Sequence, residues 1–153
     1  MDTNEQVKLR FKGVDFPQVQ LNSIQPYVES EDNKVKVEIV PRFFFPNGPN
    51  NVFKIVIQVD VSAENYFNLR VIGVGTFELS IEDVNEEERK RFINANSTAI
   101  VFPYVRAFVS QITSNVGNVV TPIILPTRFF KGDLEEIEQT AQPELFKKAK
   151  EID

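Results

Sequence analysis

Residues 51–79 read NVFKIVIQVDVSAENYFNLRVIGVGTFEL, and this stretch decides the fold. Apolar and polar residues alternate along both of its halves, a pattern typical of β-strands that have one face in a core. Ala63-Glu64-Asn65 forms a short turn between the halves. The stretch therefore predicts two antiparallel strands, with one face of the sheet apolar and the other exposed to water. The inward positions are Phe53, Ile55, Ile57, Val59 and Val61, then Phe67, Leu69, Val71, Phe77 and Leu79.

Two further strands are expected before this pair. The first covers about residues 5–11, and the connection that follows it, through Pro17 and Pro26, is too long for a hairpin. The second begins near Lys34 and meets Pro41, which suits an edge strand or a bulge. Phe43-Phe44-Phe45 then breaks the alternation, because three neighbouring aromatic side chains cannot all point into one core. At least one of these phenylalanines is expected to face away from the core.

The last third of the chain is predicted to be helical. Asn85 followed by Glu88 matches a helix cap with a returning carboxylate and opens a short acidic helix. Ser97 then caps a longer helix that ends at Gly117, and a final helix is expected from Asp133 to about residue 147. Strands followed by helices predict an α+β fold class. A chain of 153 residues without a repeat or linker predicts a single domain, residues 1–153.

The composition argues against an enzyme. The chain contains no Cys and no His, so the usual zinc ligands, cysteine nucleophiles and histidine acid–base groups are missing. Its six Gly form no phosphate-binding or dinucleotide-binding motif. Most acidic residues fall in solvated runs such as residues 86–88 and 135–136. We therefore expect no catalysis, no metal and no cofactor.

Charge and hydropathy limit the partners and the location. The formal net charge is −5, so binding of nucleic acid driven by net charge is not expected. No apolar run approaches the roughly 18–20 residues of a membrane span. The first residues, MDTNE, are polar and acidic, unlike a signal peptide. We expect a soluble, cytoplasmic protein without membrane insertion.

The helix over residues 98–116 is more apolar than a helix on one sheet requires. At 100° per residue its large apolar side chains cover about 200° of the circumference, whereas a single sheet needs a stripe of about 100°. The excess predicts a second covering surface, either the final helix or another subunit. The final helix has few large apolar groups, so self-association is favoured. The interface residues expected on this basis are Val101, Phe102, Val105, Val109 and Ile112.

Two segments resemble the SecB family of protein-export chaperones. Residues 94–108, NANSTAIVFPYVRAF, resemble the main helix of the family, which carries a Leu-Phe-Pro-Tyr-x-Arg core before an apolar helical face. Residues 119–129, VVTPIILPTRF, resemble the apolar extended segment that follows this helix. Proline inside a helix costs about 3 kcal/mol, so the Phe-Pro-Tyr match is more specific than an apolar helix alone.

The resemblance implies a four-stranded antiparallel Greek-key sheet with helices packed on one face. It also implies a homo-oligomer, a dimer of dimers with the main helices between the sheet layers. SecB-like proteins hold unfolded polypeptides in long apolar grooves; many deliver them to the translocase motor SecA, and others serve antitoxins. With no nucleotide motif in the chain, the expected function is an ATP-independent holding chaperone for export or for a dedicated partner. The alternative is a structural or adaptor oligomer that kept the fold without binding clients.

Three groups of residues are candidates for contact with an unfolded client. They are Phe43, Phe44 and Phe45; Val19, Leu21, Ile24 and Tyr27 in the long first connection; and Phe129, Phe130 and Leu134. The resemblance places the long connection beside the groove, and the third group could form its other wall. Each group also has a structural alternative. These are a subunit interface for the three phenylalanines, contact with the chain's own sheet for the connection, and the core for the third group.

Docking of SecA is doubtful, because the acids that the family presents on the solvent side of the sheet find no clean match. The outward position on the fourth strand is Arg70, with Asn68 beside it. The outward residues expected on the four strands are Lys8, Arg10, Lys12, Lys34, Lys36, Lys54 and Arg70, against Glu38, Asp60 and Glu78. This basic face is expected either to recruit an acidic partner or only to keep the sheet solvated.

Overall fold

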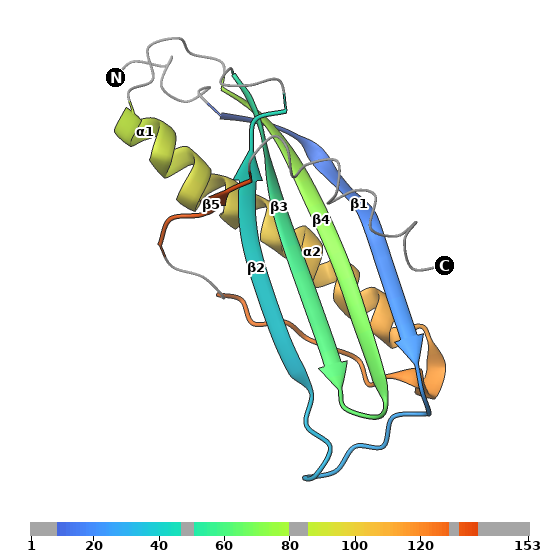
Figure 1. The fold of residues 1–153 in the computed structure, drawn as a ribbon. Helices are drawn as coiled ribbons and strands as arrows, with labels where there is room; N and C mark the ends of the chain where they lie inside the picture. The colour runs from blue at the N-terminus through green and yellow to red at the C-terminus, as the bar shows by residue number, and fades with distance from the viewer. Residues whose placement is uncertain (1–8, 47–50, 80–85, 129–131, 138–153) are drawn as a thin grey trace.

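The computed structural model describes residues 9–46, 51–79, 86–128 and 132–137 (Figure 1). The strands in these residues are β1 (Leu9–Ser23), β2 (Lys36–Phe44), β3 (Val52–Ala63), β4 (Phe67–Leu79) and β5 (Glu135–Glu136). The helical elements are α1 (Glu86–Arg91), the π-helical turn η2 (Phe92–Asn96), α2 (Ser97–Ser114) and the 3₁₀ turn η3 (Gly117–Val119). Figure 1 shows the long helix lying across one face of the sheet.

The sheet has the strand order β1-β4-β3-β2-β5. β2, β3 and β4 are successive antiparallel neighbours, and β1 pairs with β4 because the long connection after β1 carries the chain across the end of the sheet. This is a Greek-key order. The predicted α+β class and the four-stranded antiparallel sheet are therefore confirmed. The short β5, which pairs in parallel with β2, is an addition.

β1 is much longer than the predicted first strand and covers 15 residues. Its register with β4 shifts at Gly13 and again between Asp15 and Gln18. Gly13 has a φ of 130°, which only glycine adopts readily, and Pro17 falls within the second shift, where the pairing is interrupted. The prediction that the strand ends before Pro17 is wrong, because these bulges carry an edge strand past the proline.

β2 continues through Pro41 to Phe44. Pro41 pairs in register with Ile57 of β3, and β5 reaches only Arg42 and Phe43 among the described residues of β2. The edge position expected from Pro41 is therefore confirmed. The predicted break in alternation is wrong, because Phe43 packs on the helix side of the sheet and Phe44 on the opposite side.

α1, η2 and α2 form one continuous helical segment, so the prediction of two separate helices is wrong. Ser97 has helical angles, φ −67° and ψ −40°, and is therefore not an N-cap. Its buried hydroxyl group donates a hydrogen bond to the carbonyl oxygen of Ile93. Asn85 lies outside the described residues, and α2 ends at Ser114, shortly before Gly117. No helix of the described residues is long and apolar enough to cross a membrane.

The residues around β5 contradict the final helix predicted from Asp133. β5 pairs with Arg42 and Phe43 of β2, and the N–H group of Ile137 donates to the carbonyl oxygen of Phe43 (2.8 Å). Two adjacent glutamates have little preference for a strand. Glu135 and Glu136 form a strand because the open edge of β2 offers backbone groups with which they pair. The rest of the predicted helix lies outside the described residues.

Apolar side chains are buried on both faces of the sheet. On the helix side, Val101, Val105 and Val109 of α2 share one core with the inward residues of β3 and β4. Gly73 leaves room for this contact, since a Cβ atom there would lie 2.8 Å from Val105 Cγ2. The prediction of one wet face is wrong over the middle of the sheet, where a second cluster is buried on the opposite side. Its residues are Phe44, Val56, Ile72 and Val74.

Candidate polypeptide-binding groove

A pocket of about 840 Å³ lies beside the first half of the long helix. One wall comes from η2 and the first half of α2, and the other comes from the chain that returns along the helix after it. We call this pocket the helix groove, and residues 120–128 and 132–137 the return segment. The described residues that line the groove are Asn94, Ala95, Thr98, Ala99, Phe102, Pro103, Arg106, Thr127, Arg128 and Gly132.

Small side chains make the helix wall hollow. Ala95, Ala99 and Pro103 follow one another at intervals of four residues, so they lie in one row along the helix. All three are exposed and short. Beside this row Phe102, which is 3% exposed, provides a large apolar surface at the base of the groove. The helix therefore has a depression that an apolar side chain can enter.

Three side chains of the helical segment hold the return segment against it. One hydrogen bond lies near the end of the helix, one in the middle and one at the beginning. The second wall of the groove lies between the bond in the middle and the bond at the beginning. The bonds run from Ile123 N to Thr113 Oγ1 (2.8 Å), from Arg106 Nε to the carbonyl oxygen of Leu125 (2.9 Å), and from Leu134 N to Asn94 Oδ1 (2.7 Å).

The described lining of the groove is apolar and carries positive charge. Arg106 and Arg128 are its charged residues, and none of the described lining residues is acidic. Arg106 is half-buried and is oriented by its bond to Leu125, whereas Arg128 is exposed. Such a lining can take up an apolar side chain and donate hydrogen bonds to backbone carbonyl or carboxylate oxygens of an extended chain.

Two of the predicted client-contact residues adjoin the groove in sequence. Phe129 and Phe130 directly follow Arg128 but lie outside the described residues. Leu134 is 6% exposed and belongs to the main core, where its backbone is bound by Asn94. A role of Phe129 and Phe130 in the second wall stays a prediction.

The residues of the predicted first connection lie at the other end of the helix. Val19 and Leu21 belong to β1, and Ile24 is exposed directly after it. The N–H group of Tyr27 donates to the carbonyl oxygen of Asn118, beyond the end of α2 (3.0 Å). The groove is formed by the first half of the helix, so the structure does not bring this group to it.

The three phenylalanines of β2 do not form one surface. Phe43 and Phe45 are half-buried on the helix side with their ring centroids 6.0 Å apart, and the Arg89 guanidinium lies 4.9 Å from the centroid of Phe45. Phe44 is buried on the opposite face, so the expectation that one phenylalanine faces away from the main core is confirmed. None of the three is among the described residues of the groove. Their contact with a client stays a prediction.

Most of the residues expected at a subunit interface are buried within one chain. They are Val101, Phe102, Val105 and Val109, whereas Ile112 is half-buried. Val120, Ile123 and Leu125 of the return segment belong to the same core cluster. The wide apolar arc of the helix therefore has a second covering surface inside the chain, supplied by the return segment rather than by a final helix.

Apolar side chains of α2 that remain near the surface lie beside β1. Tyr104 is 51% exposed, with its ring centroid 5.5 Å from that of Phe11. Phe108 stacks on Phe16 of β1 with the centroids 3.9 Å apart. A subunit contact through the helix would therefore use this side of the molecule.

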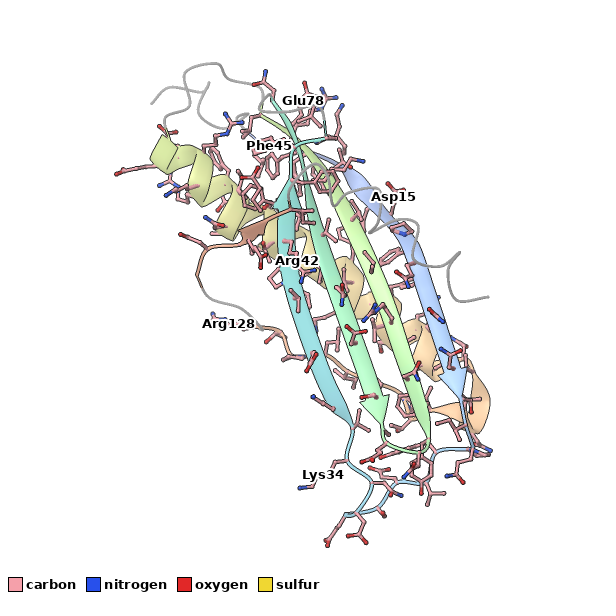
Figure 2. The ribbon with its side chains drawn as sticks, viewed as in Figure 1. Asp15, Lys34, Arg42, Phe45, Glu78 and Arg128 are labelled. Carbon is pink, nitrogen blue, oxygen red and sulfur yellow. The ribbon has the colours of Figure 1, made fainter. Side chains whose placement is uncertain are left out.

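On the outer face of the sheet, each acid of the predicted set is paired with a cation. The pairs are Asp60 with Arg70 (2.7 Å), Glu38 with Lys36 (3.1 Å) and Glu78 with Lys12 (3.6 Å). Asp15 of β1 adds a further acid, and Lys34 lies in the loop before β2 (Figure 2). Lys8 lies outside the described residues. Weak docking of SecA stays a prediction.

The helix wall of the groove can be recognised in the sequence from its small residues rather than from its large apolar ones. Small residues at 95, 99 and 103 form a row with a four-residue spacing, and such a row leaves a hollow on a helix. The second wall has no comparable signal. It depends on hydrogen bonds between residues that are far apart in the sequence, such as Asn94 and Leu134.

The Greek-key sheet with one long helix on one face defines a SecB-like fold. The family model described as preprotein translocase subunit SecB matches residues 14–125. This chain belongs to the SecB family, so the resemblance to that family is confirmed.

The chain is similar to two further proteins and to one solved structure. An uncharacterized protein of Methanocaldococcus jannaschii is 32% identical over 122 residues, which cover 75% of this chain and 76% of that protein. The protein-export protein SecB of Orientia tsutsugamushi (strain Boryong) is 26% identical over 99 residues, 62% of this chain and 59% of that protein. The SecB-like chaperone of Mycobacterium tuberculosis, solved in complex with an antitoxin peptide, has a TM-score of 0.60 at 12% identity, covering 82% of this chain and 91% of that one. This last likeness shows the fold.

Proposed function

We propose that the protein is an ATP-independent holding chaperone that binds extended apolar segments of polypeptide in the helix groove. The observation that carries the proposal is the groove itself, a pocket of about 840 Å³ whose small exposed residues surround Phe102. Membership of the SecB family supports a chaperone rather than an enzyme. The antitoxin peptide bound by the Mycobacterium tuberculosis relative supports a polypeptide as the ligand.

Binding in such a groove is driven by burial of apolar surface. A client aromatic side chain that buries about 200 Å² gains about 5 kcal/mol at about 25 cal/mol per Å², before the cost of ordering the client is subtracted. After this cost the affinity of a single segment is moderate, and release needs no nucleotide. Arg106 and Arg128 add contacts to the backbone of the client, so the groove selects an extended chain rather than a folded surface.

The client is either a pool of preproteins or one dedicated partner. The relationship to an export SecB of Orientia tsutsugamushi favours preproteins. The antitoxin complex of the Mycobacterium tuberculosis chaperone favours a dedicated partner. Co-purification of the protein from its native cell separates the two, because many clients are expected in the first case and one dominant client in the second.

An aggregation assay with a groove-filling variant tests the proposal. Ala99→Phe places a large side chain in the groove, whereas Ala107→Phe makes the same change at an exposed alanine of α2 that is not among the described groove residues. The wild-type protein is expected to slow the aggregation of an unfolded protein without ATP. Ala99→Phe should lose most of this protection and Ala107→Phe should keep it, provided that light scattering shows the same assembly for both. Equal protection by all three proteins would move the binding site away from the helix groove.

A further inference from the structure

Pro103 interrupts the backbone hydrogen bonds of α2 inside the helix groove. In an α-helix the carbonyl oxygen of each residue accepts a hydrogen bond from the N–H group four residues later. Pro103 lies within α2 and has no N–H group, so the carbonyl oxygen of Ala99 has no donor at this position. Ala99 and Pro103 are both exposed, and both line the groove. The helix wall therefore offers a hydrogen-bond acceptor that belongs to its own main chain.

A side-chain hydroxyl group in the same wall also lacks a partner. The buried hydroxyl groups of α2 are those of Ser97, Thr98 and Thr113. Ser97 and Thr113 each donate to the carbonyl oxygen four residues earlier. Thr98 is 9% exposed and lines the groove, and its Oγ1 atom has no hydrogen-bond partner in the part of the chain that the structure describes. Buried polar groups are almost always hydrogen-bonded, so an unpaired one that lines a pocket indicates a ligand.

We propose that these two groups bind the main chain of the client. The carbonyl oxygen of Ala99 accepts a hydrogen bond from a client N–H group, and the hydroxyl group of Thr98 bonds to an adjacent client amide. A threonine in a helix has two allowed χ1 rotamers, so rotation brings this hydroxyl group to the groove that its side chain already lines. The inference rests on the function proposed above and adds what the groove recognises, an amide N–H group that is not bonded within the client.

The spacing of polar groups along the groove fits an extended chain. Ala99 and Arg106 are seven residues apart, about 10 Å along the helix at about 1.5 Å per residue. About three residues of an extended client cover this distance at about 3.4 Å per residue. Alternate residues of such a chain turn their N–H and carbonyl groups to the same side. One client segment can therefore donate to Ala99 and accept from the terminal nitrogen atoms of Arg106, whose Nε atom donates to Leu125.

Replacement of single amides by esters in a bound peptide tests the inference. The probe is a fluorescent peptide with one Phe in a run of Val and Ser residues, so that its aromatic side chain fixes the register in the groove. Each N–H group near this Phe is replaced in turn by an ester oxygen atom, which removes one donor and keeps every side chain. At one position the ester should weaken binding to the wild-type protein by about threefold to tenfold, the usual net value of one hydrogen bond.

Pro103→Ala identifies the acceptor. The variant restores an N–H group at position 103, which bonds to the carbonyl oxygen of Ala99 within the helix. The loss caused by the ester should then disappear. Loss of the proline ring itself weakens the parent peptide and the ester equally, so the comparison isolates the hydrogen bond. An ester that weakens binding to Pro103→Ala as much as to the wild-type protein would overturn the assignment to Ala99.

Thr98→Val tests the hydroxyl group, because it keeps the shape of the side chain. It should weaken binding of the parent peptide by about threefold or more. Its free energy of unfolding should stay unchanged or rise, since the variant no longer buries an unpaired polar group. Thr76→Val makes the same change on the outer face of β4 and should leave the affinity unchanged. Equal affinities of Thr98→Val and the wild-type protein would show that Thr98 does not bind the client.

The same peptide separates this inference from the function on which it rests. If the parent peptide binds the wild-type protein but not Ala99→Phe, and no ester weakens its binding, the groove binds side chains alone and the inference is wrong. If the parent peptide binds Ala99→Phe as tightly as the wild-type protein, the helix groove is not the binding site. The proposed function then fails together with the inference.

Discussion

The hydroxyl group of Thr113 holds the chain that returns along the long helix, because it accepts a hydrogen bond from the backbone of Ile123. Thr113 is 1% exposed, and its Oγ1 atom both donates to the carbonyl oxygen of Val109 and accepts from the N–H group of Ile123, each at 2.8 Å. A buried hydroxyl that donates and accepts is fully satisfied in the core. The first turn of the return segment is thereby fixed, and with it the position of the second wall of the helix groove.

Thr113→Val is expected to lower the free energy of unfolding by about 1–3 kcal/mol, because it leaves the buried N–H group of Ile123 without an acceptor. Hydrogen exchange at Ile123 should accelerate by a larger factor than exchange in β3. Thr113→Ser keeps the hydroxyl group and serves as the control. Equal exchange rates at Ile123 in the valine and serine variants would show that the hydrogen bond does not hold the segment.

At the scale of elements, the pattern of apolar residues predicted those strands whose apolar and polar residues alternate regularly. β3 and β4 are long, regular strands with a short turn, and their bounds differ from the prediction by one or two residues. β1 was predicted too short because two bulges carry it past Pro17. β5 could not be predicted at all, because Glu135 and Glu136 become a strand only through the edge of β2. The same holds for the groove. Its helix wall can be predicted from the local spacing of small residues, whereas its return-segment wall depends on contacts between residues that are far apart in the sequence.

The contact between β4 and α2 depends on glycine. A Cβ atom at Gly75 would collide with Val101 Cγ2, so Gly75→Ala forces the helix away from the sheet or distorts Val101. Gly75→Ala should lower the free energy of unfolding by about 1–3 kcal/mol in urea denaturation, the usual cost of overpacking a core. Thr76→Ala, at the next residue on the opposite face, should change it by less.

A double-mutant cycle identifies the cause of this loss. Val101→Ala removes the methyl groups that a Cβ atom at Gly75 would meet. The double variant should therefore lose less stability than the sum of the two single variants, with a coupling of about 0.5–3 kcal/mol. Strictly additive losses would show that backbone strain, rather than contact with Val101, makes Gly75 necessary.

At the scale of the whole molecule, the partly exposed aromatic side chains beside β1 form the surface on which a prediction of self-association rests. We propose a dimer of dimers of the 17.5 kDa chain that uses Tyr104 and Phe108 of α2. Light scattering at micromolar concentration should give about four times the chain mass. Tyr104→Asp should reduce it, because Tyr104 is 51% exposed and belongs to this surface. Ile124→Asp is the control, since Ile124 is 78% exposed in the return segment. A monodisperse monomer in the wild-type protein would contradict the proposal.

The central claim is that the helix groove binds an extended client. Site-specific photo-cross-linking tests it most directly, with a photoreactive amino acid placed at Ala99 in one protein and at Ala107 in another. Each is mixed with a reduced, unfolded client without ATP and irradiated. The account predicts strong cross-links to the client from position 99 and weak ones from position 107, because Ala99 lines the groove and Ala107 is exposed outside its described residues. Cross-links that are as strong from position 107, or absent from position 99, would contradict it.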